Sequence, residues 1–95
     1  MNKAGQAYLK KIAHSVPAIY QIGKFGINEN FVGQINDALE ARELIKVSVL
    51  DTSMLSVKDA AYEVAKSCEA EVVQVIGRKF VLYKESKESK SIILP

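Results

Sequence analysis

Cysteine and histidine are nearly absent from this sequence, which has one of each, Cys68 and His14. A single cysteine excludes a disulfide within the chain, and these two residues are too few for a zinc site. Tryptophan is missing altogether. No apolar run approaches the ~20 residues that span a bilayer, and the first residues lack the apolar core of a signal peptide. We therefore expect a cytoplasmic protein with no metal, no cofactor and no membrane association.

Acidic residues are also missing from the N-terminal segment, since the first carboxylate belongs to Glu29. The lysines before it are Lys3, Lys10, Lys11 and Lys24, and the same segment holds His14. A local excess of cations is what a phosphate-binding surface requires, even though the whole chain has a formal net charge of only +2. Short basic N-termini are also common as solvated segments, so charge alone leaves both interpretations open.

The length of 95 residues, of which 48% are apolar, suits one small domain. Apolar side chains recur with helical spacing in three segments, at residues 3–15, 28–42 and 57–68. Strand-forming runs occupy four others, at residues 18–22, 44–50, 72–76 and 80–83. The pattern predicts a single compact α/β domain in the order α-β-α-β-α-β-β with a four-stranded mixed sheet.

The two strand–helix–strand connections predict right-handed crossovers, with the first three strands parallel and the last antiparallel to its neighbour. Both crossover helices should then cover one face of the sheet. The other face carries Gln21, Lys46, Ser48 and Gln74, so we expect only partial cover there, from the first helix. Pro17 is expected to stop that helix.

Residues 85–95 differ in character from residues 1–84. Glu85–Ser91 repeats Glu-Ser-Lys without apolar periodicity and is expected to be mobile. The chain then closes on Ile92–Pro95, which could dock on the sheet or engage a partner. We expect docking, because an exposed apolar tail promotes aggregation.

Few residues suit catalysis. His14 and Cys68 could form a thiolate–imidazole pair, but Cys68 lies on the apolar stripe of the third helix, where a free cysteine acts as a small apolar side chain. No phosphate-binding loop of the Walker type is present. Glu40 and Glu43 lie beside Arg42 and are interpreted as a solvated charge cluster. We expect a protein that is not an enzyme.

The segment Gly23-Lys24-Phe25-Gly26 joins a strand to a helix. Unpaired backbone N–H groups at a helix start favour an anion, and glycine lets a phosphodiester approach the main chain. The KH domain clamps a nucleic-acid backbone with the same Gly-x-x-Gly spacing. Two close glycines are also typical of tight strand-to-helix turns. The following helix and the acid-free N-terminal segment favour the nucleic-acid interpretation.

For three side chains, in this loop and in the predicted hairpin, the sequence leaves two interpretations. Phe25 could stack on an unpaired base, or fold back and anchor the loop, which we favour for a lone phenylalanine. Arg78 and Lys79 in the predicted hairpin turn could equally contact RNA or keep the turn solvated.

Several blocks of the sequence occur together in the order and spacing of one known family. They are Ala13-His14, Pro17, Gln21–Gly26, Ala38-Leu39, Arg42–Val47, Val73–Gly77, Val81–Tyr83 and Ile93–Pro95. The chain thus resembles the YhbY-type CRM domain over nearly its whole length. One departure is Cys68-Glu69-Ala70, where relatives often have a glycine that ends the helix.

The resemblance implies a bacterial RNA-binding protein associated with precursors of the large ribosomal subunit; related plant domains serve in chloroplast intron splicing. It also implies a fold similar to the C-terminal domain of bacterial translation initiation factor three. The RNA-contacting loop of the family corresponds here to Gly23, Lys24, Phe25 and Gly26. The implied basic surface includes Lys10, His14, Arg42 and Lys46.

Two functions follow as hypotheses. The first is a non-catalytic, monomeric protein that binds ribosomal RNA through the Gly-x-x-Gly loop during large-subunit assembly. The second is a protein-interaction module on the ribosome or a GTPase, which would use the half-polar sheet face and the C-terminal tail.

Overall fold

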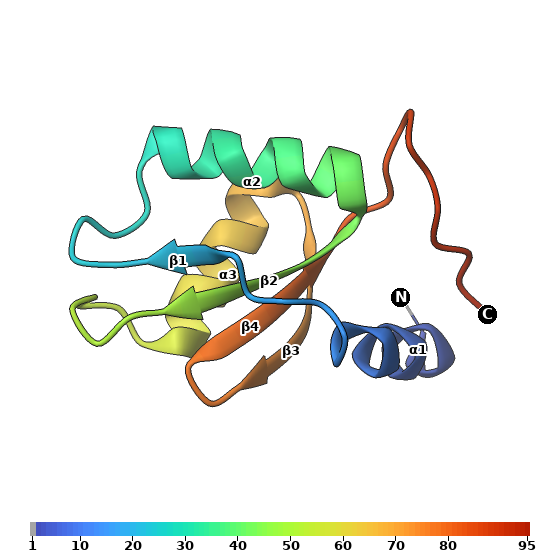
Figure 1. Ribbon diagram of the computed structural model, residues 1–95, viewed down its shortest axis with the longest axis horizontal. Helices are drawn as coiled ribbons and strands as arrows, with labels where there is room; N and C mark the ends of the chain where they lie inside the picture. The colour runs from blue at the N-terminus through green and yellow to red at the C-terminus, as the bar shows by residue number, and fades with distance from the viewer. Residues whose placement is uncertain (1) are drawn as a thin grey trace.

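The computed structural model of the chain describes residues 2–95. Three helices and four strands lie within them in the predicted order (Figure 1). The helices are α1 (Lys3–Ala13), α2 (Glu29–Arg42) and α3 (Val57–Cys68). The strands are β1 (Tyr20–Ile22), β2 (Leu44–Val49), β3 (Glu71–Ile76) and β4 (Lys79–Tyr83). The predicted α/β fold with a four-stranded mixed sheet is confirmed.

Polar side chains fix the start of each helix. Asn2, Asn28 and Ser56 precede α1, α2 and α3, and each side-chain oxygen accepts a hydrogen bond from the N–H three residues later, at 2.7, 2.8 and 3.1 Å. Caps of this kind contribute about 1 kcal/mol each. Asn and Ser are among the residue types most favoured at this position, because their short side chains reach the free N–H groups of the first turn.

Helix α1 ends at Ala13, earlier than the predicted end at residue 15. The chain continues in a tighter turn, in which Ser15 and Val16 donate to the carbonyls three residues back, at 3.2 and 3.0 Å. Pro17 follows this turn, and it has no N–H to extend the pattern. The physical reason for the shorter helix is this tightened last turn.

The strands of the sheet run in the order β1-β2-β4-β3. Strands β1 and β2 are parallel, and β4 is antiparallel to both β2 and β3. The first three strands therefore share one direction, as predicted. The last strand lies between the second and the third, and a register irregularity at Val72/Gln74 bends the β3–β4 pair.

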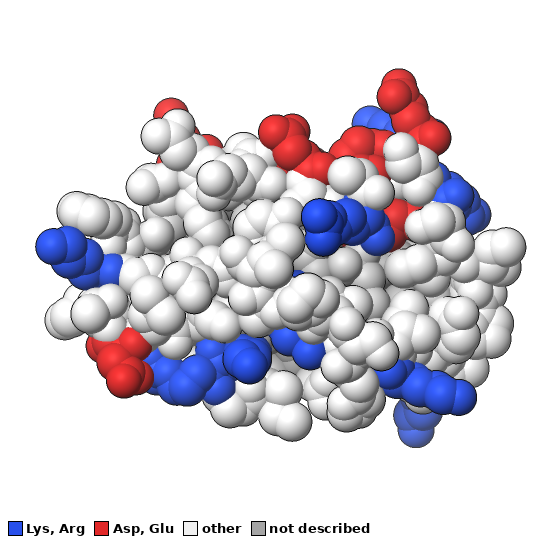
Figure 2. Space-filling model, viewed as in Figure 1, with Lys and Arg blue, Asp and Glu red and all other residues white. Residues whose placement is uncertain are grey.

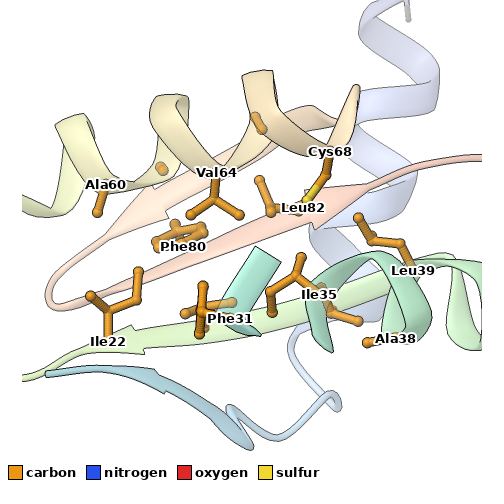
Figure 3. Packing of buried hydrophobic residues seen from close by; sticks show 14 of the residues in the cluster. Ile22, Phe31, Ile35, Ala38, Leu39, Ala60, Val64, Cys68, Phe80 and Leu82 are labelled. Atoms are coloured by element: carbon orange, nitrogen blue, oxygen red, sulfur yellow. The ribbon is translucent and has the colours of Figure 1, made fainter. Parts of the chain in front are cut away.

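Helices α2 and α3 cover one face of the sheet, and the larger core lies between them and the strands (Figure 3). Phe80 and Leu82 of β4 are fully buried against Ile35 of α2 and Val64 of α3. Each such side chain contributes about 1.5–3 kcal/mol on burial. The prediction that both crossover helices share one face is confirmed.

Helix α1 covers only part of the opposite face. Leu9 of α1 packs with Val81 and Tyr83 of β4 in a second, smaller cluster. The polar side chains predicted on this face stay partly or fully accessible to solvent, namely Gln21, Lys46, Ser48 and Gln74. The open part of this face, together with the loop beyond β1, is where the candidate site lies.

Glu43 is fully buried, which corrects its interpretation as part of a solvated charge cluster. Its carboxylate accepts hydrogen bonds from the backbone N–H groups of Ser86, Ser91 and Ile92, at 2.8, 2.7 and 2.8 Å. Glu40 accepts a further bond from the Ser86 hydroxyl. The sequence did not indicate this role, because the donors lie more than 40 residues away along the chain.

Beyond these bonds, the apolar end of the chain turns back toward α1 (Figure 1). Ile92 and Leu94 pack against the smaller cluster beside α1, whereas Ile93 points away and is 80% exposed. The C-terminal residues therefore dock on the domain in this structure. The mobility expected for residues 85–91 stays a prediction.

Helix α3 ends where the sequence predicts, with Glu69 in the left-handed conformation at φ 55° and ψ 40°. Ala70 donates its N–H to the Ala65 carbonyl at 2.8 Å, which closes the helix end. A side chain in this conformation costs about 1–2 kcal/mol, a strain that glycine does not have.

Replacing Glu69 with glycine is expected to raise the free energy of unfolding by about 0.5–1 kcal/mol, because the relief of strain exceeds the entropy that glycine adds to the unfolded chain. Urea denaturation followed by circular dichroism measures the change. Glu69→Ala is the control, since alanine keeps the Cβ atom. Equal stabilisation by both substitutions would contradict this explanation.

Candidate nucleic-acid interface

The Gly-x-x-Gly loop, residues 23–26, follows the edge strand β1 and forms a tight turn. The Gly26 N–H donates to the Gly23 carbonyl at 3.0 Å, which places Lys24 and Phe25 at the tip. Both tip side chains are exposed. The loop is therefore accessible, as a backbone clamp requires.

The two glycines of this loop have different roles. Gly26 has φ +65°, a conformation that side chains rarely adopt, and nothing lies within 4 Å of where its Cβ would stand. A Cβ at Gly23 would lie 3.6 Å from the side chains of Leu50 and Thr52, which is ordinary contact. Gly26 is thus required by the turn, and the open space beside it admits a close ligand.

Phe25 does not anchor the loop, and the preference for that role is wrong. Its side chain is 81% exposed, and the ring contacts Lys24, whose Nζ lies 5.2 Å from the ring centroid. The core positions near the loop are already filled by Ile22 and Phe31, so the turn directs Phe25 outward. An exposed aromatic ring beside an ammonium group can stack on a base while the cation meets a phosphate.

The start of α2 is less available to an anion than the sequence predicts. The Asn28 side chain already accepts from the Phe31 N–H. Glu29, in the first turn, adds a carboxylate that repels a phosphate. Contacts to a phosphate therefore fall mainly to the loop and to Lys24.

The predicted basic residues Lys10, His14 and Lys46 share the α1 side of the sheet. Lys46 lies directly across from Val81, which belongs to the cluster under α1. Lys10 lines a shallow hollow with Gln74 of β3, and His14 is exposed where α1 ends. The structure thus brings three of the four residues of the implied basic surface to one side.

Arg42 is not among them. It lies exposed in the last turn of α2, the helix on the other face of the sheet. Figure 2 shows Lys and Arg side chains along the side of the molecule where the β3–β4 hairpin and α1 lie, whereas most acidic side chains in this view gather over α2 and the C-terminal segment. Basic side chains also lie among these acidic ones, so it is the scarcity of acidic side chains on the α1 side that favours it as the surface for a polyanion.

Arg78 has a structural role. Its guanidinium donates from Nε to the Val49 carbonyl at 3.0 Å and from Nη2 to the Leu50 carbonyl at 2.8 Å. It also lies 3.6 Å from Asp51. These bonds tie the hairpin to the end of β2, next to the Gly-x-x-Gly loop. Lys79 is exposed beside it.

Sequence reasoning missed an open groove of about 600 Å³ between the loop and α2. The lining residues are Gln21, Gly23, Phe25, Gly26, Asn28, Asn30, Phe31 and Gln34. The sequence did contain a signal for this groove. Asn30 and Gln34 are amides at a helical i, i+4 spacing on the outer side of α2 near the loop, where charged residues would be common.

Cys68 and His14 do not come together. The Cys68 thiol is buried between α2 and α3 and donates weakly to the Val32 carbonyl at 3.9 Å, while His14 is on the α1 side. Burial raises the pKa of the Cys68 thiol, although Lys84 opposes this rise. Among residues 2–95, no group of three or more potential metal-binding side chains occurs. In the same part of the chain, no helix is long and apolar enough to cross a membrane.

Comparison with known proteins finds relatives that match over most of this chain. The chain is 50% identical over 88 residues to "probable RNA-binding protein YqeI" of Bacillus subtilis, across 93% of this chain and 92% of that protein. It is 32% identical over 83 residues to an RNA-binding protein of Haemophilus influenzae, across 87% and 84% of the two chains. A third relative, "probable RNA-binding protein MJ0652" of Methanocaldococcus jannaschii, is 33% identical over 78 residues, which span 80% of this chain and 58% of that protein.

The fold also matches a solved structure, that of the hypothetical protein SAV1595 from Staphylococcus aureus, a candidate RNA-binding protein. The TM-score is 0.82 at 47% identity, and the match covers 100% of this chain and 99% of that one. Finally, residues 1–84 match the CRS1 / YhbY (CRM) domain. Because this match covers most of the sequence and agrees with the order of its motifs, the chain belongs to the CRS1/YhbY (CRM) domain family.

Proposed function

We propose that this protein binds RNA without catalysis, through the Gly-x-x-Gly loop and the basic residues of the α1 side. The observation that carries the proposal is the exposed tip of the loop, where Lys24 and Phe25 stand clear of the domain. The names of relatives from three organisms support it, since one is named an RNA-binding protein and two are named probable RNA-binding proteins.

In this mechanism the RNA backbone passes over the open space beside Gly26. Lys24 neutralises a phosphate, and Phe25 offers its ring to an adjacent base. Lys46, Lys10 and His14 extend the footprint across the α1 side. Most of these contacts are to phosphates, so the shape of the RNA sets much of the specificity.

The biological target in this proposal is ribosomal RNA in a precursor of the large subunit. It rests on the family resemblance of the loop and of the flanking blocks. Crosslinking the protein to RNA in cells and mapping the contacted nucleotides tests it. Crosslinks concentrated in large-subunit ribosomal RNA support the target, and crosslinks spread over unrelated transcripts contradict it.

Replacing Lys24 with alanine is expected to weaken binding by a similar factor for RNAs of unrelated sequence, because one phosphate contact is lost. The slope of log affinity against log salt concentration should fall by roughly one unit for the same reason. Fluorescence anisotropy titrations at several salt concentrations measure the slope. Lys66→Ala on α3 is the matched control, since Lys66 is exposed on the other side of the sheet. Identical slopes for Lys24→Ala and the parent would remove Lys24 from the interface.

The alternative, a protein-interaction module that uses the C-terminal tail, has less support. Ile92 and Leu94 pack against the protein's own smaller cluster, so they are occupied in this conformation. Of the apolar end, Ile93 and Pro95 are exposed.

A further inference from the structure

We infer that the groove between the Gly-x-x-Gly loop and α2 holds one unpaired nucleobase, whose edge is recognised by the amides of Asn30 and Gln34. This inference rests on the proposed RNA binding and adds to it a preference for single-stranded RNA and for particular bases. It concerns a site on the α2 side of the loop, distinct from the basic residues on the α1 side.

Three elements build the groove. Gln21 comes from β1, the loop supplies Gly26 and the rim residue Phe25, and α2 supplies Asn30 and Gln34. Its volume of about 600 Å³ lies within the range of small-ligand sites, roughly 300–1,000 Å³. The space is therefore sufficient for a planar base that enters from the loop side.

The chemistry of the lining suits a base better than a phosphate. None of the residues that line the groove carries a charge. A phosphate that entered it would lose its hydration and would find no positively charged side chain in return. Amide groups both donate and accept hydrogen bonds, which is what the edge of a base requires. Glu29, near the mouth at the start of α2, further disfavours an anion.

The amides are free to act in this way. Within residues 2–95, the side chains of Gln21, Asn30 and Gln34 form no hydrogen bond to another residue. Asn28 differs, because its amide oxygen caps α2 by accepting from the Phe31 N–H at 2.8 Å. Asn28 therefore holds the wall in place, while Asn30 and Gln34 remain available for a ligand.

Two aromatic side chains line the groove. Phe31 lines its inner part and is almost buried, at 9% exposed, whereas Phe25 stands at the rim, 81% exposed. A base seated on this apolar surface would stack while its edge faces the amides. The Lys24 ammonium, 5.2 Å from the Phe25 ring centroid, would then lie near the phosphate of the same nucleotide.

This arrangement excludes paired RNA, because a base within an A-form helix does not present its pairing edge to a groove of this kind. The protein is therefore expected to bind loops, bulges or single strands in preference to a continuous duplex. Among the four bases, the protein should bind most tightly the one whose edge forms hydrogen bonds with both amides.

The test uses a double variant in which Asn30→Ala is combined with Gln34→Ala, and it compares the RNA affinity of this variant with that of the parent. The ligands are short single-stranded homopolymers of each base and a fully paired duplex. The parent is expected to prefer one homopolymer over the others and over the duplex. The double substitution is expected to reduce affinity for that homopolymer about five- to tenfold, with the salt slope unchanged. Asn36→Ala is the matched control, because Asn36 is an exposed amide of α2 that does not line the groove.

The outcomes separate this inference from the proposed function. If parent and double variant bind all four homopolymers with the same relative affinities, the base site is wrong, while a reduced salt slope for Lys24→Ala would still support RNA binding by the loop. If the parent binds no RNA at low salt, both proposals fail. Thermal unfolding followed by circular dichroism confirms that the variants are folded.

Discussion

Reversing two charges, Lys24→Glu together with Lys46→Glu, is expected to reduce RNA affinity by about 30- to 100-fold. Each reversal removes an attraction to the polyanion and adds a repulsion, and each reversal is expected to cost about 1–1.4 kcal/mol of binding free energy near a protein surface. Lys24 lies at the loop tip and Lys46 on the open sheet face, so both ends of the proposed footprint are altered. Anisotropy titrations at fixed salt measure the loss.

The matched control reverses Lys66 and Lys87, which are exposed and belong neither to the loop nor to the open sheet face. Lys66 is in the last turn of α3, and Lys87 is in the C-terminal segment next to Glu40. Both double variants have the same net charge, so any difference in their RNA affinity results from where the reversed charges lie. Equal losses of affinity would mean that binding follows overall charge, and the proposed interface would be abandoned.

Replacing Glu43 with glutamine is expected to lower the free energy of unfolding by about 2–3 kcal/mol. Glutamine has the same shape, but its amide nitrogen cannot accept, so backbone N–H groups of Ser86, Ser91 or Ile92 lose a charged acceptor. Urea denaturation at neutral pH measures the change. Glu63→Gln, at an exposed position of α3, is the control and should change stability by less than about 0.5 kcal/mol.

The pH dependence of stability provides an independent check on Glu43. Burial alone would raise the pKa of its carboxyl, but the three backbone N–H groups and the Ser91 hydroxyl outweigh burial and hold the pKa below its usual value of 4.5. A lowered pKa in the folded state means that this stabilisation is fully present above pH 4.5 and is lost as the pH falls further. The difference in stability between parent and Glu43→Gln should therefore shrink in acid. A difference that stays constant from pH 7 to acid would show that the negative charge of Glu43 is not the cause.

Much of the fold could be predicted because the information is local. The apolar stripes of α2 and α3 follow from i, i+3 and i+4 spacing, and the caps Asn28 and Ser56 act within a few residues. The loop at residues 23–26 could be located because its two glycines and the following helix are contiguous in the sequence. Its conformation at Gly26 is likewise a local property.

The features that could not be predicted depend on distant contacts. A hairpin can join a sheet on either side, so the sequence did not fix β4 between β2 and β3. Glu43 resembled a solvent-exposed residue because its partners follow only after residue 85. The outward direction of Phe25 depends on which side chains already fill the core near the loop, and the groove depends on how β1 and α2 meet. No periodicity within one element carries that information.

The position of β4 in the middle of the sheet also affects how the chain folds during its synthesis. Within residues 2–95, strands β2 and β3 are both bonded to β4 and not to each other, and the only other partner of β2 is the three-residue strand β1. Until residue 83 has left the ribosome, the nascent chain holds no pair of long strands. Because β4 joins β2 to β3, we expect the four-stranded sheet to form only once β4 is available.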